Sequence, residues 1–130
     1  MKSDFRSRLA VLCVIAFSVV GLSHAGQGHG PKVVKKMPYA AIAPLLKAQC
    51  ISCHNSKNHP EKVDFSSYDA IMKSGERGPI VVPGHPEKSK LMMYVDGSKQ
   101  PRMPYKKAPL SAASIQLLKV WISLGAINKP

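Results

Sequence analysis

The amino-acid sequence predicts an all-α fold, and three observations support this class. The clearest is an apolar stripe of helical period between Ser111 and Gly125, where the spacing fits an amphipathic helix. Shorter segments upstream begin with a serine or proline at a capping position and end at a glycine, as short helices do. No segment of the sequence alternates polar and apolar residues as a half-buried strand requires. We therefore expect four helices joined by long loops.

Residues 1–25 have the features of a secretory signal peptide. Basic residues dominate the start, an apolar run covers residues 9–20, and small residues at 23–25 suit a cleavage site. The apolar run is shorter than the roughly 20 residues that a membrane-spanning helix needs, so an uncleaved anchor is the weaker alternative. We expect an exported, periplasmic protein with no stable membrane insertion after cleavage.

The exported chain is strongly basic. The whole sequence carries 19 Lys and Arg against 7 Asp and Glu, a formal net charge of +12. Without residues 1–25 there remain 16 basic and 6 acidic residues, a net charge of +10. Such a charge favours docking to redox proteins with acidic surfaces, at rates that fall as salt rises. The lysines are not interleaved with aromatic residues, so nucleic acid is not an expected partner.

Residues 26–38 are rich in Gly, Lys and Pro and are expected to form a flexible lead-in to one domain of residues 39–130. The first helix of this domain is predicted over residues 39–49, where apolar residues follow a helical spacing. Pro44 either lies in the first turn of a helix that starts near Ala43 or kinks a longer one. In both cases the helix leads into the cysteine motif described below.

Two short helices are expected in the middle of the domain, and a longer one closes it. The first follows the cap-like Ser66-Ser67 and stops at Gly75, and the second begins at Pro86 and ends at Gly97. The closing helix starts after a Ser111 cap. The side chains that the last two helices are expected to turn toward the core are Leu91, Met92, Val95, Ile115, Leu117, Leu118, Trp121, Ile122 and Leu124.

The stretch Cys50-Ile51-Ser52-Cys53-His54 has the spacing of covalent c-type haem attachment. Each thiol can add across a haem vinyl group to form a thioether, and the histidine can then give its imidazole to the iron. The remaining cysteine, Cys13, lies in the signal peptide, so no long-range disulfide is possible in the exported chain. A thioredoxin-like pair would need a βαβ context, and a structural zinc site would need a second pair of ligands. The motif therefore predicts one covalently attached haem c.

The iron of such a haem needs a second axial ligand opposite His54, and Met103 is favoured. It lies in Pro101-Arg102-Met103-Pro104, a loop between two helices that the prolines stiffen. The other late methionines fall at helix positions, where methionine more often fills a core. His54 itself is expected to donate its second ring N–H to a backbone carbonyl that the sequence does not identify. A histidine or an open site stays an alternative to Met103, and the other residues considered are Met37, Met72, Met92, Met93, His29, His59 and His85.

A few charged and aromatic residues are candidates for contacts around the haem. Arg77 and Arg102 could reach the propionates, although a solvated surface is their ordinary role. Tyr68, Tyr94 and Tyr105 could pack on the porphyrin, and Trp121 is most simply a residue between helices.

Several short segments between Leu46 and Ala126 form a recognisable series with the haem motif. They are Cys50-Ile51-Ser52-Cys53-His54, Val63-Asp64-Phe65-Ser66-Ser67, Gly78-Pro79-Ile80-Val81-Val82-Pro83-Gly84, Pro86-Glu87-Lys88-Ser89, Met103-Pro104, Pro109-Leu110-Ser111 and Trp121-Ile122-Ser123-Leu124-Gly125-Ala126.

Together these segments resemble the planctomycete-type cytochrome c domain, a branch of the class I c-type cytochromes. The resemblance implies the cytochrome c fold, in which N- and C-terminal helices cross around one haem. It also implies that Cys50 and Cys53 form thioethers, that His54 is the proximal ligand and that Met103 is the distal ligand. The sequence departs from the family at Glu61-Lys62, where a glycine pair is often seen.

These features predict an exported monohaem cytochrome c that transfers single electrons between periplasmic redox partners and has no catalysis of its own. One alternative is a haem-based sensor or small-ligand binder in which Met103 is displaceable. Another is the electron-transfer subunit of a periplasmic dehydrogenase. A sulfur-to-iron charge-transfer band in the oxidised protein would favour the carrier over the sensor.

Overall fold

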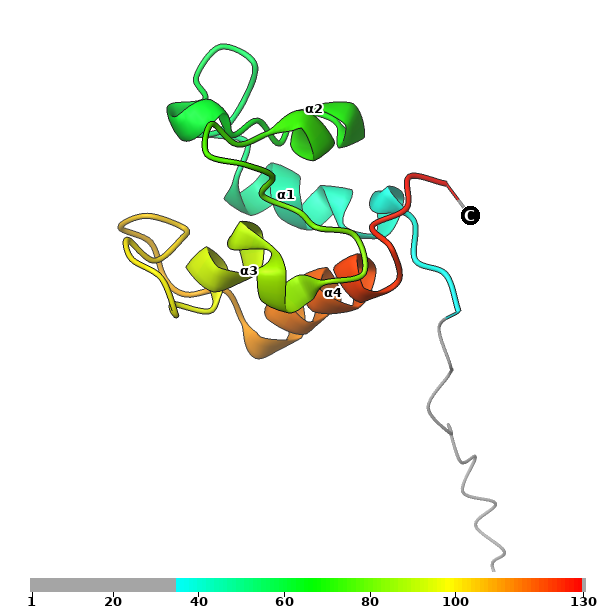
Figure 1. Cartoon of the computed structure of the whole chain (residues 1–130). Coiled ribbons are helices and arrows are strands. Elements are labelled where there is room, and N and C mark those ends of the chain that lie inside the picture. The colour runs from blue at the N-terminus through cyan, green and yellow to red at the C-terminus, as the bar shows by residue number, and fades with distance from the viewer. Residues whose placement is uncertain (1–34, 130) are drawn as a thin grey trace, which may run out of the picture. The chain divides into compact units, whose positions relative to one another are not determined.

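The computed structural model describes residues 35–129, and within them the chain is helical without a strand. Four α-helices follow one another in sequence: α1 (Ala43–Gln49), α2 (Tyr68–Lys73), α3 (Lys90–Val95) and α4 (Ala112–Ser123) (Figure 1). The all-α class is therefore confirmed. The predicted signal peptide of residues 1–25 and most of the lead-in lie outside the described residues. None of the helices between residues 35 and 129 is long and apolar enough to cross a membrane.

The segment that leads to the cysteine motif consists of two short helices. A single 3-10 turn covers Tyr39–Ala41, and α1 begins at Ala43 with Pro44 in its first turn. Proline is tolerated there because the N–H groups of a first turn have no partner within the helix. The sequence left open whether Pro44 starts or kinks the helix, and the structure shows that it starts it.

Helix α2 has the cap that the sequence predicts. The Ser67 hydroxyl accepts a hydrogen bond from the Ala70 N–H at 3.1 Å. The chain leaves the helix through Gly75, where φ is +111°. A Cβ on this glycine would lie 2.1 Å from the Gly78 carbonyl oxygen, so no other residue fits the turn.

The helix predicted from Pro86 is interrupted, which corrects that prediction. A single 3-10 turn covers Pro86–Lys88, and α3 starts after Ser89, whose backbone is extended. Ser89 is fully buried, and its hydroxyl accepts from the Val82 N–H at 2.9 Å and donates to the His85 carbonyl at 2.9 Å. The bond to Val82, seven residues earlier, fixes a bend that the capping and helical spacing around Ser89 do not indicate. The inward positions on α3 are buried as predicted: Leu91, Met92 and Val95.

Helix α4 closes the fold and carries the centre of the core. The Ser111 hydroxyl accepts from the Ser114 N–H at 3.1 Å, which confirms the predicted cap. Trp121 is fully buried and donates its indole N–H to the Ile127 carbonyl at 3.2 Å. The Tyr39 N–H donates to the same carbonyl at 2.8 Å, so the segments before α1 and after α4 meet. One hydrophobic cluster contains residues of every helix: Ile42, Leu46, Ile71, Leu91, Met92, Val95, Leu118, Trp121 and Ile122.

Candidate functional site

The loop after α1 continues the turn of the helix, and this brings the motif side chains to one wall. The Cys50 N–H donates to the Leu46 carbonyl at 2.8 Å and thereby ends α1. The next turn is closed by the N–H groups of Cys53 and His54, which both reach the Cys50 carbonyl, at 3.1 and 3.0 Å. The Asn55 side-chain amide donates to the Ile51 carbonyl at 2.8 Å and holds the end of the loop.

A cavity of about 830 Å³ lies against this loop. Cys50, Cys53 and His54 line one part of it, and Met103 lines it from a segment about fifty residues later in the chain. The volume is within the range of about 300 to 1,000 Å³ that small-molecule and cofactor sites occupy. The structure therefore brings together all four residues that the sequence singled out. Other apolar side chains of the lining include Val63, Phe65, Ile80, Leu91 and Val95.

His54 is held in one tautomer by a backbone carbonyl. Its Nδ1 lies 3.2 Å from the Val63 carbonyl oxygen, and a carbonyl can only accept. Nδ1 must therefore carry the proton, which leaves Nε2 with a free lone pair. Burial lowers the pKa of His54, and the bond to Val63 opposes this in part. The ring also packs against Phe65 in a T-shaped arrangement, with centroids 5.7 Å apart and planes at 87°. The imidazole is thus neutral at neutral pH and oriented as a metal ligand requires.

The two thiols differ in their surroundings. Cys50 is half-buried, and burial raises the pKa of its thiol to about 11, although the nearby Lys107 ammonium acts in the opposite direction. Cys53 is exposed at the edge of the same cavity. At neutral pH the Cys50 thiol is therefore uncharged, as suits a wall that is largely apolar.

Met103 is fixed to α3 through its backbone. The Met103 N–H donates to the Tyr94 carbonyl at 2.9 Å, and the following residue, Pro104, is buried. The thioether is half-buried and lines the cavity. His29 lies outside the described residues. The other axial candidates within the described part of the chain do not line this cavity: Met37, Met72, Met92, Met93, His59 and His85.

The secondary candidates divide between the cavity and the rest of the domain. Arg77 lines the cavity and forms an ion pair with Glu61 on its rim. Arg102 does not line it and donates instead to the Lys107 carbonyl at 3.0 Å. Of the aromatic candidates, Tyr94 and Tyr105 line the cavity, whereas Tyr68 and Trp121 pack in the core.

Three lysines also line the cavity, Lys90, Lys99 and Lys107, and the sequence did not identify which lysines these would be. The Lys90 ammonium donates to the Arg77 and Gly78 carbonyls. The three lysines reach the cavity because loops that are far apart in the sequence meet there, and no local sequence motif identifies them.

The donor set and the walls of the cavity fit a haem c. Two thiols in one turn suit two thioether bonds, and an imidazole with an unprotonated Nε2 suits the iron. A thioether from a second segment completes the pair of axial donors, and apolar side chains would surround a porphyrin. Cys50, Cys53, His54 and Met103 are thus the residues that would hold the group, and these roles remain predictions.

Comparison with protein-family models gives a match to the family described as planctomycete cytochrome C over residues 50–106. Comparisons with curated proteins and with solved structures gave no match. The matched residues begin at the first cysteine of the motif and extend beyond Met103, so they include every residue of the predicted ligand set. Members of this family are c-type cytochromes, which indicates a haem c cofactor and a role in electron transfer. Residues 50–106 of this chain are therefore similar to the planctomycete cytochrome c family.

Proposed function

We propose that this protein is an exported monohaem cytochrome that carries single electrons between periplasmic redox proteins. One haem c is attached through Cys50 and Cys53, and its iron is ligated by His54 and Met103. The observation that carries the proposal is the meeting of these four side chains in one largely apolar cavity. Export rests on the signal-like residues 1–25, and it agrees with the chemistry because c-type haem is attached outside the bacterial cytoplasm.

The residues of the chain have separate tasks in this function. When bound, haem supplies a one-electron change at its iron. The Val63 carbonyl keeps the His54 ring in one orientation and one tautomer. The Met103 backbone is held to α3, so that its sulfur stays at the cavity. The apolar lining excludes water and provides the low-dielectric surroundings that tune a redox potential.

We further propose that the partners present acidic surfaces and dock where the cavity opens. Lys99 and Lys107 line the cavity and are exposed, and neither has a carboxylate partner among residues 35–129.

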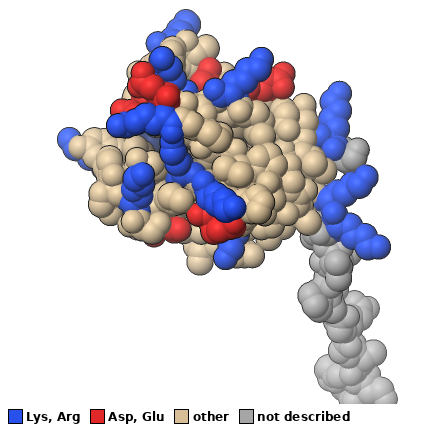
Figure 2. Space-filling model, in the orientation of Figure 1, with Lys and Arg blue, Asp and Glu red and all other residues tan. Residues whose placement is uncertain are grey.

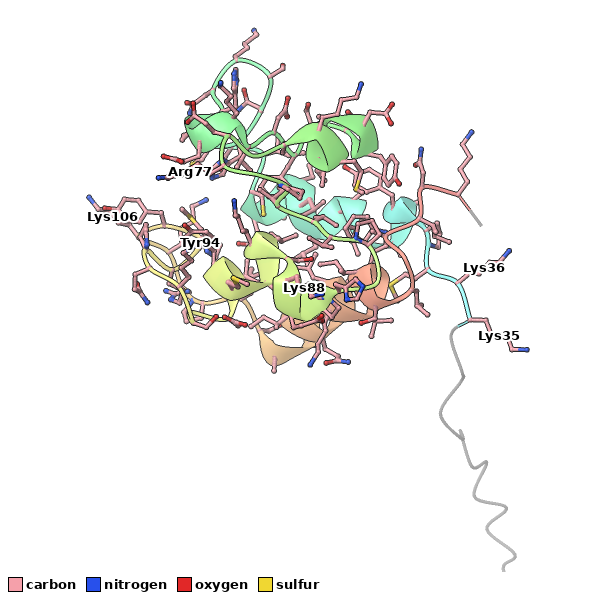
Figure 3. The ribbon with its side chains drawn as sticks, in the orientation of Figure 1. Lys35, Lys36, Arg77, Lys88, Tyr94 and Lys106 are labelled. Atoms are coloured by element: carbon pink, nitrogen blue, oxygen red, sulfur yellow. The ribbon has the colours of Figure 1, made fainter. Side chains whose placement is uncertain are left out.

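The figures show how other side chains are arranged on this domain. Arg77, Tyr94 and Lys106 extend from one side, away from Lys35 and Lys36 (Figure 3). On the face that Figure 2 shows, lysine and arginine side chains are spread out with a few carboxylates between them. Such a surface steers an acidic partner and still permits its release.

An absorption spectrum of the oxidised protein tests the carrier against the ligand binder. A carrier with an intact Met103 bond shows a sulfur-to-iron charge-transfer band and binds carbon monoxide slowly after reduction. A sensor lacks the band and binds carbon monoxide rapidly, and this result would overturn the proposal. The bond between the Met103 N–H and the Tyr94 carbonyl supports the closed arrangement.

A pull-down of the native protein tests the remaining alternative, a subunit of a periplasmic dehydrogenase. A free carrier is recovered alone in salt of physiological strength, because rim charges are largely screened there. Recovery of a catalytic subunit in fixed stoichiometry would contradict the free carrier and favour the subunit.

A further inference from the structure

The peptide unit between Val63 and Asp64 is hydrogen-bonded at both ends. Its carbonyl oxygen, which belongs to Val63, lies 3.2 Å from Nδ1 of His54. Its N–H, which belongs to Asp64, donates to the Ser74 hydroxyl at 2.8 Å. Because the peptide group is planar and conjugated, these two bonds act on one delocalised unit. The chain of contacts therefore runs from Ser74 through a single peptide to the imidazole.

The Ser74 hydroxyl is buried and oriented for this contact. Ser74 is only 5% exposed and follows the last residue of α2. Its single proton has a short bond to the Ala70 carbonyl at 2.7 Å, and the Asp64 carbonyl at 3.2 Å is the longer alternative. With the proton directed to Ala70, an oxygen lone pair is left for the Asp64 N–H. The serine is thus an acceptor to the peptide that His54 contacts.

We propose that Ser74 is a positioning residue for His54, acting through the Val63–Asp64 peptide. The inference rests on the proposed function, in which the imidazole of His54 binds the haem iron. A peptide whose N–H is hydrogen-bonded is more polarised, and its carbonyl oxygen is a stronger acceptor. A stronger bond to Nδ1–H makes the imidazole a more basic ligand. A more basic ligand favours the oxidised iron, so Ser74 lowers the reduction potential.

The domain contains a second serine in a nearly identical setting, and it provides a control. Ser89 is fully buried, accepts from the Val82 N–H at 2.9 Å and donates to the carbonyl four residues earlier, that of His85. Ser74 likewise donates to the carbonyl four residues earlier. The difference is that the peptide bonded by Ser89 makes no contact with His54 among the contacts of the described residues. Loss of either hydroxyl removes similar hydrogen bonds, but only the loss of the Ser74 hydroxyl should change the properties of His54 and the haem.

The test compares the holoproteins of Ser74→Ala, Ser74→Thr and Ser89→Ala with the wild type. The readouts are the reduction potential and the NMR resonance and solvent exchange of the His54 Nδ1–H. In Ser74→Ala we expect a higher potential and Nδ1–H exchange that is about tenfold faster, the effect of weakening one hydrogen bond. Ser74→Thr keeps a hydroxyl and should restore both readouts. Ser89→Ala should lose stability while both readouts stay at their wild-type values.

An unchanged potential and Nδ1–H in Ser74→Ala would overturn the inference, as would an equal change in Ser89→Ala. If Ser74→Ala does not fold, hydrogen exchange of the Asp64 amide in the wild-type protein tests the inference instead. Slow hydrogen exchange of that amide supports the bond to Ser74, and exchange at the rate of an exposed amide overturns it. Failure of the proposed function is distinguishable, because the wild-type protein itself would then lack haem or lack a haem-shifted His54 resonance.

Discussion

His54 is the residue through which the loop after α1 and the loop before α2 meet. Its Nδ1 contacts the Val63 carbonyl, its own carbonyl accepts from the Phe65 N–H at 3.1 Å, and its ring forms a T-shaped pair with the Phe65 ring. These contacts set the tautomer and the orientation of the imidazole before any ligand is considered. At the level of single side chains, the site is therefore preorganised on the His54 side.

The clearest prediction at this scale concerns Met103. Replacing it with alanine should open the sixth iron position, lower the reduction potential and allow rapid carbon monoxide binding, because thioether ligation favours reduced iron. Met93→Ala is the matched control, since Met93 lies on α3 but does not line the cavity. Spectra and potentials of both variants check the prediction. An unchanged Met103→Ala spectrum would show that another residue is the ligand.

A second prediction at this scale concerns alkaline pH. Burial, with a smaller contribution from Asp64, raises the pKa of Tyr39 above its ordinary value. A phenol with a raised folded-state pKa contributes stability that is complete below the unfolded pKa of about 10 and is lost as pH rises through the folded pKa. Tyr39→Phe should therefore flatten the loss of unfolding free energy above about pH 10. The control is Tyr105→Phe, at a ring that is 57% exposed. If both variants lose stability as the wild type does, Tyr39 is not the cause.

The sequence was most informative about residues whose chemistry is local. The spacing of Cys50, Cys53 and His54 predicted the group that the cavity fits, and the prolines around Met103 separated it from the helical methionines.

The sequence did not predict that the carbonyl that accepts from His54 Nδ1–H belongs to Val63. The preceding residues, Glu61 and Lys62, both adopt positive φ, at 58° and 56°, which non-glycine residues rarely do. The path of that loop is therefore set by contacts with distant residues and not by local preference.

Short helices at this site depend on their ends more than on their length. Helices α1, α2 and α3 have seven, six and six residues, which is too short to be stable alone in water. Caps and buried contacts hold them: proline in the first turn of α1 and a serine cap on α2. These signals are readable in the sequence, and the predicted starts of α2 and α4 were correct. The break at Ser89 was not readable, because it depends on a bond to Val82.

The cap of α4 gives a prediction at the scale of the element. Ser111→Ala leaves the Ser114 N–H without its partner and should lower the free energy of unfolding by about 1 kcal/mol. Ser123→Ala, at the other end of the same helix, removes an exposed hydroxyl that donates to the Lys119 carbonyl, and it should cost less than about 0.5 kcal/mol. Denaturant unfolding of both holoproteins measures the difference. Equal losses would contradict a specific role for the cap.

At the scale of the whole molecule, part of the basic charge lies on the surface around the cavity. The net charge of +12, or +10 without residues 1–25, includes exposed lysines near the cavity, and surface charges act through a field that salt screens over about 8 to 10 Å. The sequence predicted the sign and size of this charge. It did not show which lysines border the cavity, because Lys99 and Lys107 reach it only through the fold.

Two pairs of neighbouring lysines allow a charge-matched test of docking. Lys106→Gln with Lys107→Gln and Lys35→Gln with Lys36→Gln remove the same charge, but the first pair lies beside the cavity and the second away from it (Figure 3). We expect the first double variant to slow electron transfer to a carboxylate-terminated electrode and to weaken its salt dependence. The second should have a smaller effect on both. Equal effects would mean that net charge alone, and not its position near the cavity, controls docking.

Covalent attachment of haem through Cys50 and Cys53 can be tested by a pyridine haemochrome spectrum of the exported protein. We expect one haem per chain that stays with the polypeptide after acid–acetone extraction, with the spectrum of two thioether bonds. Cys50→Ser or Cys53→Ser should give the spectrum of one thioether bond. Haem that is extracted from the wild-type protein, or a protein exported without haem, would show that Cys50 and Cys53 do not bind haem covalently.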